Sequence, residues 1–140
     1  MSDLSDVNEF NRGVIEQFRE SGGNPGPPFE GAPLLILHST GAKSGKVRLA
    51  PIVYRKVGDS WAVFASKAGA PNNPDWFHNL VANPKASIEV GADTIDVVAR
   101  VLGDEEREPI WTEQKQVMPG FAEYEQKTDR QIPVVLLERA

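Results

Sequence analysis

The stretch LLILHSTGAKSGKVRLAPIVYRKVGDSWAVFAS, residues 34–66, decides the fold. It holds three largely apolar runs, at residues 34–38, 47–57 and 61–66, separated by segments rich in glycine and polar residues. Runs of this length with such borders predict β-strands, and Gly58-Asp59-Ser60 predicts a hairpin turn between the last two. The stretch is therefore expected to form three consecutive antiparallel strands.

The middle run predicts a strand with two different faces, because side chains alternate along a strand. One face holds Val47, Leu49, Pro51 and Val53, and the other holds Arg48, Ala50, Ile52 and Tyr54. Pro51 has no amide hydrogen to donate to a sheet, so we expect the strand to be bulged or to lie at an edge there. Such a break leaves backbone groups free for a ligand.

Outward from this stretch, helices are predicted at residues 3–21, 73–83, 104–118 and 121–127, and strands at residues 85–90, 94–101 and 132–137. We expect Asn73 to cap the second helix, with Pro74 in its first turn. Pro109 should kink the third helix or start it afresh at Glu108. Six strands joined mostly by tight turns predict an α+β fold, an antiparallel barrel with helices packed outside.

The first helix is expected to be amphipathic. Its apolar face holds Val7, Phe10, Val14 and Phe18, and Gly22-Gly23 should end it. Residues 6–19 carry three acidic and two basic side chains, which favours docking on the barrel over lying on a membrane surface, although peripheral contact with the membrane stays open. Residues 24–33 are rich in proline and glycine and predict a connecting loop.

Length and composition exclude several classes of function. A chain of 140 residues predicts one domain, residues 1–140. The absence of cysteine excludes disulfides and thiolate chemistry and makes the cytoplasm the expected compartment. There is no secretory signal and no apolar run of about 20 residues for a transmembrane helix. The net charge of −5 argues against nucleic-acid binding. His38 and His78 lack acidic partners at ligand spacing, so no metal site is expected.

The charges are unevenly distributed. Residues 38–67 hold six lysines and arginines against the single acidic residue Asp59, a local balance of +5 in an acidic chain. Within them, Ser39-Thr40-Gly41-Ala42-Lys43-Ser44-Gly45-Lys46-Val47-Arg48 forms a turn between two strands. Clustered amides in a glycine-rich turn point at an anion, and Lys43 and Arg48 supply countercharge. A solvated hairpin tip is the alternative, because such residues are common in turns.

A second turn makes an anion site more plausible. Ser66, Lys67 and Gly69 follow a strand and lead into a helix N-terminus, where unpaired amides favour negative charge. Two such turns on adjoining strands predict a site for a negatively charged ligand. Trp76, in the first helical turn, either flanks a planar ring of that ligand or anchors the helix in the core.

In order and spacing, these segments resemble the deazaflavin-dependent nitroreductase and quinone reductase family of actinobacteria. The matching segments are Phe29-Glu30-Gly31-Ala32-Pro33, the turn at 40–48, Ala65-Ser66-Lys67, Asn73-Pro74-Asp75-Trp76, Asn79-Leu80, Ala82-Asn83-Pro84, Met118-Pro119 and Thr128-Asp129-Arg130. The resemblance implies one split antiparallel β-barrel domain, of the FMN-binding split-barrel type, that binds coenzyme F420. This cofactor is an 8-hydroxy-5-deazaflavin with a phosphodiester and an oligoglutamate tail. The implied reaction passes its hydride to a small quinone-like or nitroaromatic acceptor.

The resemblance also assigns site residues. Lys43, Ser44 and Arg48 should hold the phosphate and tail of the cofactor. The side chain and ring should lie against Leu49, Ala50, Pro51, Ile52 and Val53 on one strand and Phe64, Ala65, Ser66 and Lys67 at the end of the next. Asp75, Trp76, Phe77, His78 and Asn79 should close over it, and Phe121 and Tyr124 should line the acceptor pocket. No catalytic acid or base is assigned, because the deazaflavin supplies the hydride chemistry.

One departure from the family pattern bears on the acceptor. Phe121 stands where nitroimidazole-activating members carry a tyrosine, so quinone reduction is expected more readily than nitroimidazole activation. Two rival functions stay open, the same barrel carrying FMN and a non-enzymatic carrier of the deazaflavin. A homodimer is expected by analogy with other split barrels.

Overall fold

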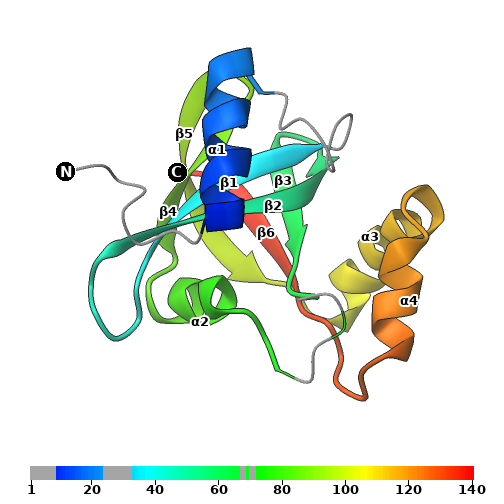
Figure 1. The fold of residues 1–140 in the computed structure, drawn as a ribbon. Coiled ribbons are helices and arrows are strands. Elements are labelled where there is room, and N and C mark those ends of the chain that lie inside the picture. Colours follow the sequence, from blue (N-terminus) through cyan, green and yellow to red (C-terminus); the bar gives the residue numbers. More distant parts are fainter. Residues whose placement is uncertain (1–8, 24–32, 67–68, 70–71) are drawn as a thin grey trace.

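The structure is a computed structural model that describes residues 9–23, 33–66, 69 and 72–140. In chain order its elements are α1 (Glu9–Ser21), β1 (Leu34–Thr40), β2 (Val47–Val57), β3 (Ser60–Phe64), α2 (Asp75–Ala82), β4 (Lys85–Val90), β5 (Asp93–Val101), α3 (Asp104–Val117), α4 (Gly120–Gln126) and β6 (Val134–Arg139) (Figure 1). The expected helices and strands are therefore confirmed within this part of the chain, with ends shifted by a few residues. No helix in these ranges is long and apolar enough to span a membrane.

The six strands form a closed barrel in the order β1-β2-β3-β6-β5-β4, and every neighbouring pair is antiparallel. The predicted fold class is confirmed. In Figure 1, α1 crosses the outside of the barrel, α2 lies below it, and α3 and α4 stand together at one side.

The long strand β2 is shared between two neighbours. Its first part pairs with β1, up to Val53 opposite Leu34, and only Tyr54–Val57 pairs with β3. Pro51 pairs with Ile36 on one side and has no β3 partner on the other. The expected edge at Pro51 is confirmed, and it leaves one side of the β2 backbone outside the sheet ladder.

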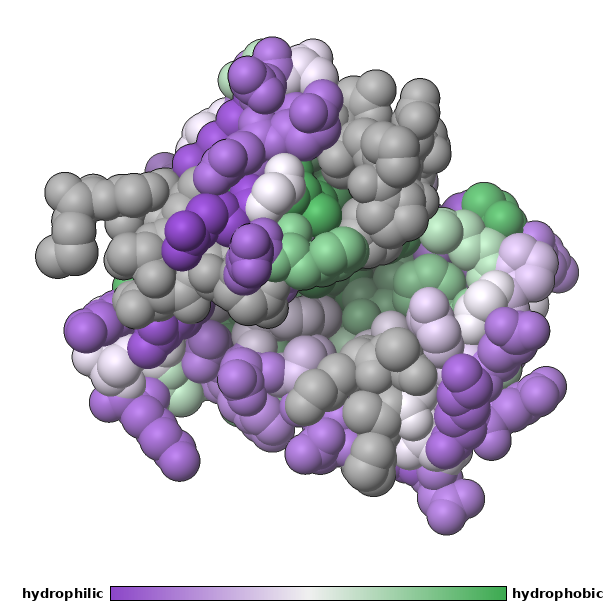
Figure 2. Space-filling model, viewed as in Figure 1, coloured by the Kyte–Doolittle hydropathy of each residue, from purple (hydrophilic) through white to green (hydrophobic). Residues whose placement is uncertain are grey.

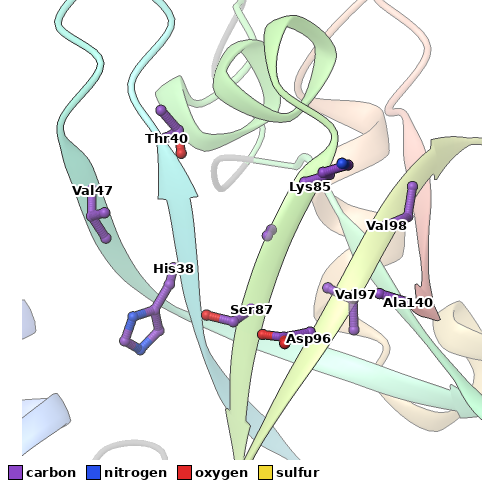
Figure 3. Close-up of a pocket in the computed structure, with 10 residues that line it drawn as sticks. His38, Thr40, Val47, Lys85, Ser87, Asp96, Val97, Val98 and Ala140 are labelled. Carbon is purple, nitrogen blue, oxygen red and sulfur yellow. The ribbon is translucent and has the colours of Figure 1, made fainter.

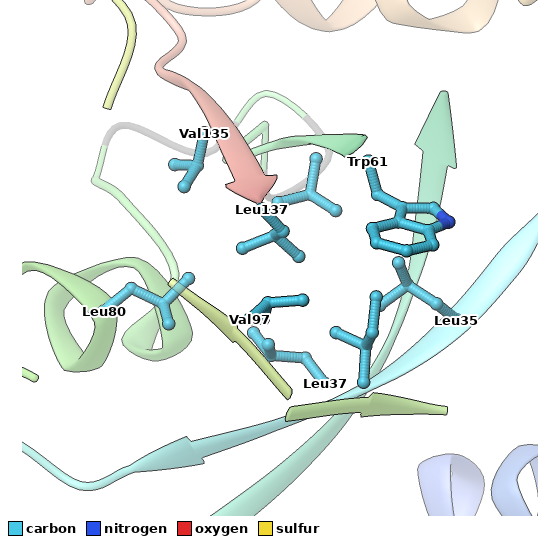
Figure 4. Close-up of a cluster of buried hydrophobic side chains, with 9 residues drawn as sticks. Leu35, Leu37, Trp61, Leu80, Val97, Val135 and Leu137 are labelled. Carbon is cyan, nitrogen blue, oxygen red and sulfur yellow. The ribbon is translucent and has the colours of Figure 1, made fainter. Parts of the chain in front are cut away.

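The barrel interior is a single cluster of buried side chains (Figure 4). It comprises Leu35, Leu37, Trp61, Val63, Leu80, Ile88, Val97, Val135 and Leu137. Leu80 comes from α2, so this helix is anchored in the barrel core, and Ile52 and Tyr54 of β2 pack against the same cluster. Leu49 and Val53 belong instead to clusters outside the barrel, which confirms the two predicted faces of β2.

Helix α1 docks on the outer face of β1 and β2 through Val14, Ile15 and Phe18. The sequence correctly places Val14 and Phe18 on the buried face, but it is wrong for Phe10, which is 58% exposed. Phe10 lies one helical turn before Val14, the first residue of α1 in this contact. The start of the predicted helix, with Val7, falls outside the described residues.

The end of α1 meets the β4–β5 turn. Gly23 donates its amide hydrogen to the carbonyl oxygen of Phe18 at 2.8 Å, and its φ of +123° suits glycine. A Cβ at Gly23 would lie 2.7 Å from Cα of Gly91, closer than real contacts allow. Gly23 is therefore required for this close approach as well as for ending the helix.

An ion cluster fastens α1 to β4 and β1. Arg19 donates to both carboxylate oxygens of Glu89, at 3.0 and 2.8 Å, and Nε2 of His38 lies 2.5 Å from the same carboxylate. Burial alone would raise the pKa of Glu89, but the hydrogen bonds from Arg19 and His38 outweigh it and hold that pKa below its ordinary value of 4.5. The ionised carboxylate is thus the form that the folded protein stabilises.

Replacing Glu89 with glutamine should lower the free energy of unfolding by about 1 kcal/mol at neutral pH. The pKa of Glu89 is lower in the folded protein than in the unfolded chain. The stabilisation is therefore fully present at pH values above the pKa of the unfolded state, and it is lost as the pH falls through the pKa of the folded state. Thermal unfolding from pH 7 down to pH 3 should show the difference from wild type shrinking at the acid end. Glu16→Gln, at an exposed position of the same helix, is the control. If the difference in stability between Glu89→Gln and wild type stays constant with pH, the ionised carboxylate is not the stabilising form.

Two local predictions concern prolines and their neighbours. Of the two alternatives at Pro109, the fresh start at Glu108 is excluded, because helix α3 runs through Pro109. The residue at the N-cap of α2 is Pro74, with no side-chain cap, and the amide oxygen of Asn73 instead accepts a hydrogen bond from Arg130 at 2.6 Å. A long-range contact has replaced the local cap that the sequence favours.

Candidate cofactor-binding site

The turn between β1 and β2 is tightly hydrogen-bonded. Gly41 donates its amide hydrogen to Lys46 O at 2.7 Å, and Gly45 donates to Gly41 O at 3.0 Å. Gly45 has a φ of +71°, and a Cβ at Gly41 would lie 2.6 Å from Oγ of Ser44. The backbone of the turn therefore favours glycine at position 45, while glycine at position 41 leaves room for the Ser44 hydroxyl.

Two asparagines of the α2 region hold the turn in place. Oδ1 of Asn79 accepts the amide hydrogen of Ala42 at 3.0 Å, and its Nδ2 donates to Oγ of Ser39 at 3.4 Å. One helical turn later, Nδ2 of Asn83 donates to the carbonyl oxygen of Thr40 at 3.4 Å. Asn79 is buried, and so is Ser39. The turn is thus braced by a helix that is itself anchored in the barrel core.

A cavity of about 910 Å³ opens beside this turn. It is lined by Asn11, Ser39, Gly41, Ala42, Lys43, Ser44, Arg48, Leu49, Ala50, Asp75, Trp76, His78 and Asn79. These residues come from α1, the end of β1, the β1–β2 turn, the first part of β2, and α2. Figure 2 shows this face hollowed between the part that holds α1 and the part below it, with hydrophobic colour at the floor and mostly hydrophilic residues below it.

Nine of the positions that the sequence assigns to the cofactor share this cavity. They are Lys43, Ser44, Arg48, Leu49, Ala50, Asp75, Trp76, His78 and Asn79. Among them Lys43 is exposed, Arg48 is half-buried, and Asp75 opens α2 as its first residue. Because the amides of Gly41, Ala42 and Gly45 are bonded within the turn or to Asn79, the cavity offers an anion its two cations, together with a tryptophan and a carboxylate from the start of α2.

Four cavity residues have no assigned role in the sequence-based prediction. Ser39 lies near the end of β1, and Gly41 and Ala42 lie in the turn that follows, so extending the site to the whole segment 39–48 would have found them. Asn11 carries no such signal, because only the docking of α1 on the barrel brings it to the cavity.

The remaining assigned positions that the structure describes do not line the cavity. Ile52 and Phe77 pack against the barrel core, Val53 packs between the outer clusters, and Pro51 lies at the free edge of β2. At the end of β3, Phe64, Ala65 and Ser66 are buried. Lys67 lies outside the described residues.

Phe121 and Tyr124 lie in a different place from the cavity. Phe121 is 7% exposed and makes edge contacts with Phe64 and Trp111, with ring centroids 5.5 and 6.1 Å away. Tyr124 stands against Phe121, with centroids 5.4 Å apart and the rings steeply inclined. The two predicted acceptor residues are therefore brought together, within the aromatic cluster that joins α3 and α4 to β3 and β6.

A second, smaller cavity of about 480 Å³ lies on β1, β4 and β5 (Figure 3). His38, Ser87 and Asp96 are among its lining residues. Over the described ranges, no group of three or more histidine, aspartate and glutamate side chains could hold a metal ion.

Comparison with known proteins places the chain in a family. The model of the family described as F420H(2)-dependent quinone reductase matches residues 10–139. An F420H(2)-dependent quinone reductase of Mycobacterium tuberculosis strain H37Rv is 36% identical over 128 residues, which cover 87% of this chain and 85% of the relative.

Two solved structures share both fold and sequence with the chain. An F420-H2 dependent reductase, FDR-A, superimposes with a TM-score of 0.70 at 42% identity, covering 76% of this chain and 94% of its own. A protein solved as a domain-swapped dimer has a TM-score of 0.72 at 38% identity, covering 93% and 98% of the two chains. By its sequence and its fold, the chain belongs to the F420H(2)-dependent quinone reductase family.

Proposed function

We propose that this protein transfers a hydride from reduced coenzyme F420 to a quinone-like acceptor, with the cofactor in the cavity beside the β1–β2 turn. The observation that carries the proposal is the gathering of Lys43, Arg48 and the Ser44 hydroxyl at one cavity, beside a turn that Asn79 holds in place. A multiply negative ligand suits that donor set.

The residues present fit the cofactor. The cavity volume of about 910 Å³ lies in the range of small-molecule sites. Lys43, Ser44 and Arg48 would hold the phosphate and the acidic tail. Leu49 and Ala50, next to the unpaired edge of β2, would lie along the side chain and ring, and Trp76 would cover the ring from α2.

When bound, the deazaflavin supplies the hydride. The protein would orient the cofactor and exclude water from it. The β1–β2 turn would hold the anionic end of the cofactor, while Leu49 and Trp76 would keep water from its ring. A quinone that accepts the hydride becomes a quinol anion, which would take its proton from solvent, so none of the nine cavity positions assigned to the cofactor is required to supply one. The reaction rate should therefore depend on the fit of the cofactor more than on the ionisation of any one side chain.

The proposal is tested by mixing purified protein with chemically reduced F420 and menadione and following the return of deazaflavin absorbance. Turnover that scales with protein concentration is expected. Binding of F420 without turnover across quinones and nitro compounds would favour the carrier function, and a yellow protein that retains FMN through purification would favour the flavin alternative.

The acceptor preference follows from Phe121. Because its ring offers no hydroxyl to hold or protonate a nitro group, kcat/KM should be higher for menadione than for a nitroimidazole by about tenfold, the worth of roughly one hydrogen bond. Parallel assays with a fixed concentration of reduced F420 measure the ratio. Equal values for both acceptors would contradict the assignment of Phe121 to the acceptor pocket.

We further propose that the protein works in the cytoplasm as a homodimer. The lack of cysteine is consistent with a reducing compartment, and one relative at 38% identity was solved as a domain-swapped dimer. Light scattering during size-exclusion chromatography should give twice the chain mass of 15.4 kDa. A single-chain mass at all concentrations would exclude the dimer.

A further inference from the structure

Arg130 lies on the connection between α4 and β6 and reaches two segments that are distant in sequence. Its Nη1 donates to Oδ1 of Asn73 at 2.6 Å, and its Nη2 donates to the carbonyl oxygen of Ser66 at 3.0 Å. Asn73 stands just before α2, and Ser66 follows the end of β3. One planar guanidinium therefore links three elements of the fold.

The two acceptors of Arg130 stand next to residues that the proposed function uses. Asn73 is followed by Pro74, the N-cap of α2, and then by Asp75 and Trp76, which line the cavity. Ser66 is itself assigned to the cofactor and is buried. The distance between Ser66 and the start of α2 is thus set by a side chain that does not line the cavity.

A second contact ties the same region to α4. Gly69 donates its amide hydrogen to the carbonyl oxygen of Ser66 at 2.9 Å and has a φ of +82°. A Cβ at Gly69 would lie 2.8 Å from Cβ of Lys127 and 3.0 Å from the carbonyl oxygen of Tyr124. The backbone at Gly69 therefore rests directly on the end of the helix that carries the predicted acceptor residues.

We infer that Arg130 is a positioning residue for hydride transfer. By holding Ser66 and Asn73 at once, it fixes the first turn of α2, which lines the cofactor cavity, relative to α4, which carries the predicted acceptor residues. This inference rests on the proposed function. Arginine suits the task because its planar fork satisfies two acceptors in fixed geometry, which the single ammonium of lysine does not. Burial lowers the pKa of Arg130, yet a guanidinium remains charged at neutral pH.

The test compares R130K and R130A with wild type, with R100K as the matched control. Arg100 pairs with Glu106 and Glu138 at an exposed site away from the cavity. For both Arg130 variants, the Kd of oxidised F420 and the KM of the reduced form should rise by about tenfold, the effect of one charge-assisted hydrogen bond. The KM for menadione should change less, and R100K should match wild type.

A double-mutant cycle with N73A separates positioning from general loss of stability. If the two side chains act through their mutual bond, N73A should weaken F420 binding on its own and add little in the R130A background. The inference would be overturned if the effects of N73A and R130A on Kd simply added, or if R130K had the Kd and KM of wild type. Neither result would affect the proposed function. A wild-type protein that does not bind F420 would overturn both.

Discussion

Replacing Arg48 with glutamate is expected to weaken the binding of oxidised F420 by about a hundredfold, since it removes a charge-assisted contact and puts a negative charge in its place. Arg48 is half-buried and lines the cavity between the braced turn and the edge of β2. Lys43, which is exposed, should have a smaller effect, about tenfold for Lys43→Glu, because solvent screens it. Titration followed by deazaflavin absorbance gives each Kd.

The control for these charge reversals lies in the same turn. Lys46→Glu changes the net charge by the same amount, yet Lys46 does not line the cavity. It should alter Kd by about threefold or less, through the long-range field alone. Arg48→Gln, which removes the charge without reversing it, guards against a folding defect. If Lys43→Glu and Lys46→Glu weaken F420 binding equally, the turn attracts the cofactor only through its overall charge and not through a contact with Lys43.

Replacing Trp111 with alanine should lower the free energy of unfolding by about 3–5 kcal/mol, the usual cost of removing a large buried aromatic side chain. Trp111 is fully buried, with Phe64 and Phe121 at centroid distances of 5.8 and 6.1 Å. Its Nε1 also donates to the carboxylate of Glu125. The indole therefore joins α3 both to β3 and to α4.

Chemical denaturation measures this loss, with Val117→Ala as the control in the same helix. Val117 is 64% exposed, so its truncation should cost about 0.5 kcal/mol or less. Because the loss is centred on α3 and α4, the residual folded fraction of Trp111→Ala should still bind F420. A loss below about 1 kcal/mol would mean that the aromatic cluster is loosely packed and that Phe121 is freer than its burial indicates.

Short sequence patterns correctly predicted those features of the fold that depend on residues close together in the chain. Alternation along β2 and the missing amide hydrogen of Pro51 placed both faces and the free edge correctly. The same reasoning failed at Phe10 and Asn73. Burial of Phe10 depends on where α1 happens to cross the strands, and Asn73 exchanges its local cap for a bond to Arg130, which lies far along the chain.

The candidate site was predicted to a similar degree. The glycine turn and the start of α2 could be assigned from charge, turn chemistry and resemblance, and both line the cavity. Asn11 could not, because it reaches the cavity only through packing of α1. Asn79 was assigned as a cover for the cofactor, whereas its side-chain amide is already bonded to Ala42 and Ser39, a partnership that no short-range pattern reveals.

The most direct test of the account compares F420 with the 8-hydroxy-5-deazaflavin ribityl compound that has the same ring but neither phosphate nor glutamates. If the braced cationic turn holds the anionic end, F420 should bind to the wild-type protein about a hundredfold more tightly than the truncated compound, and raising the salt concentration should narrow the gap. Equal Kd values for the two compounds would contradict the account.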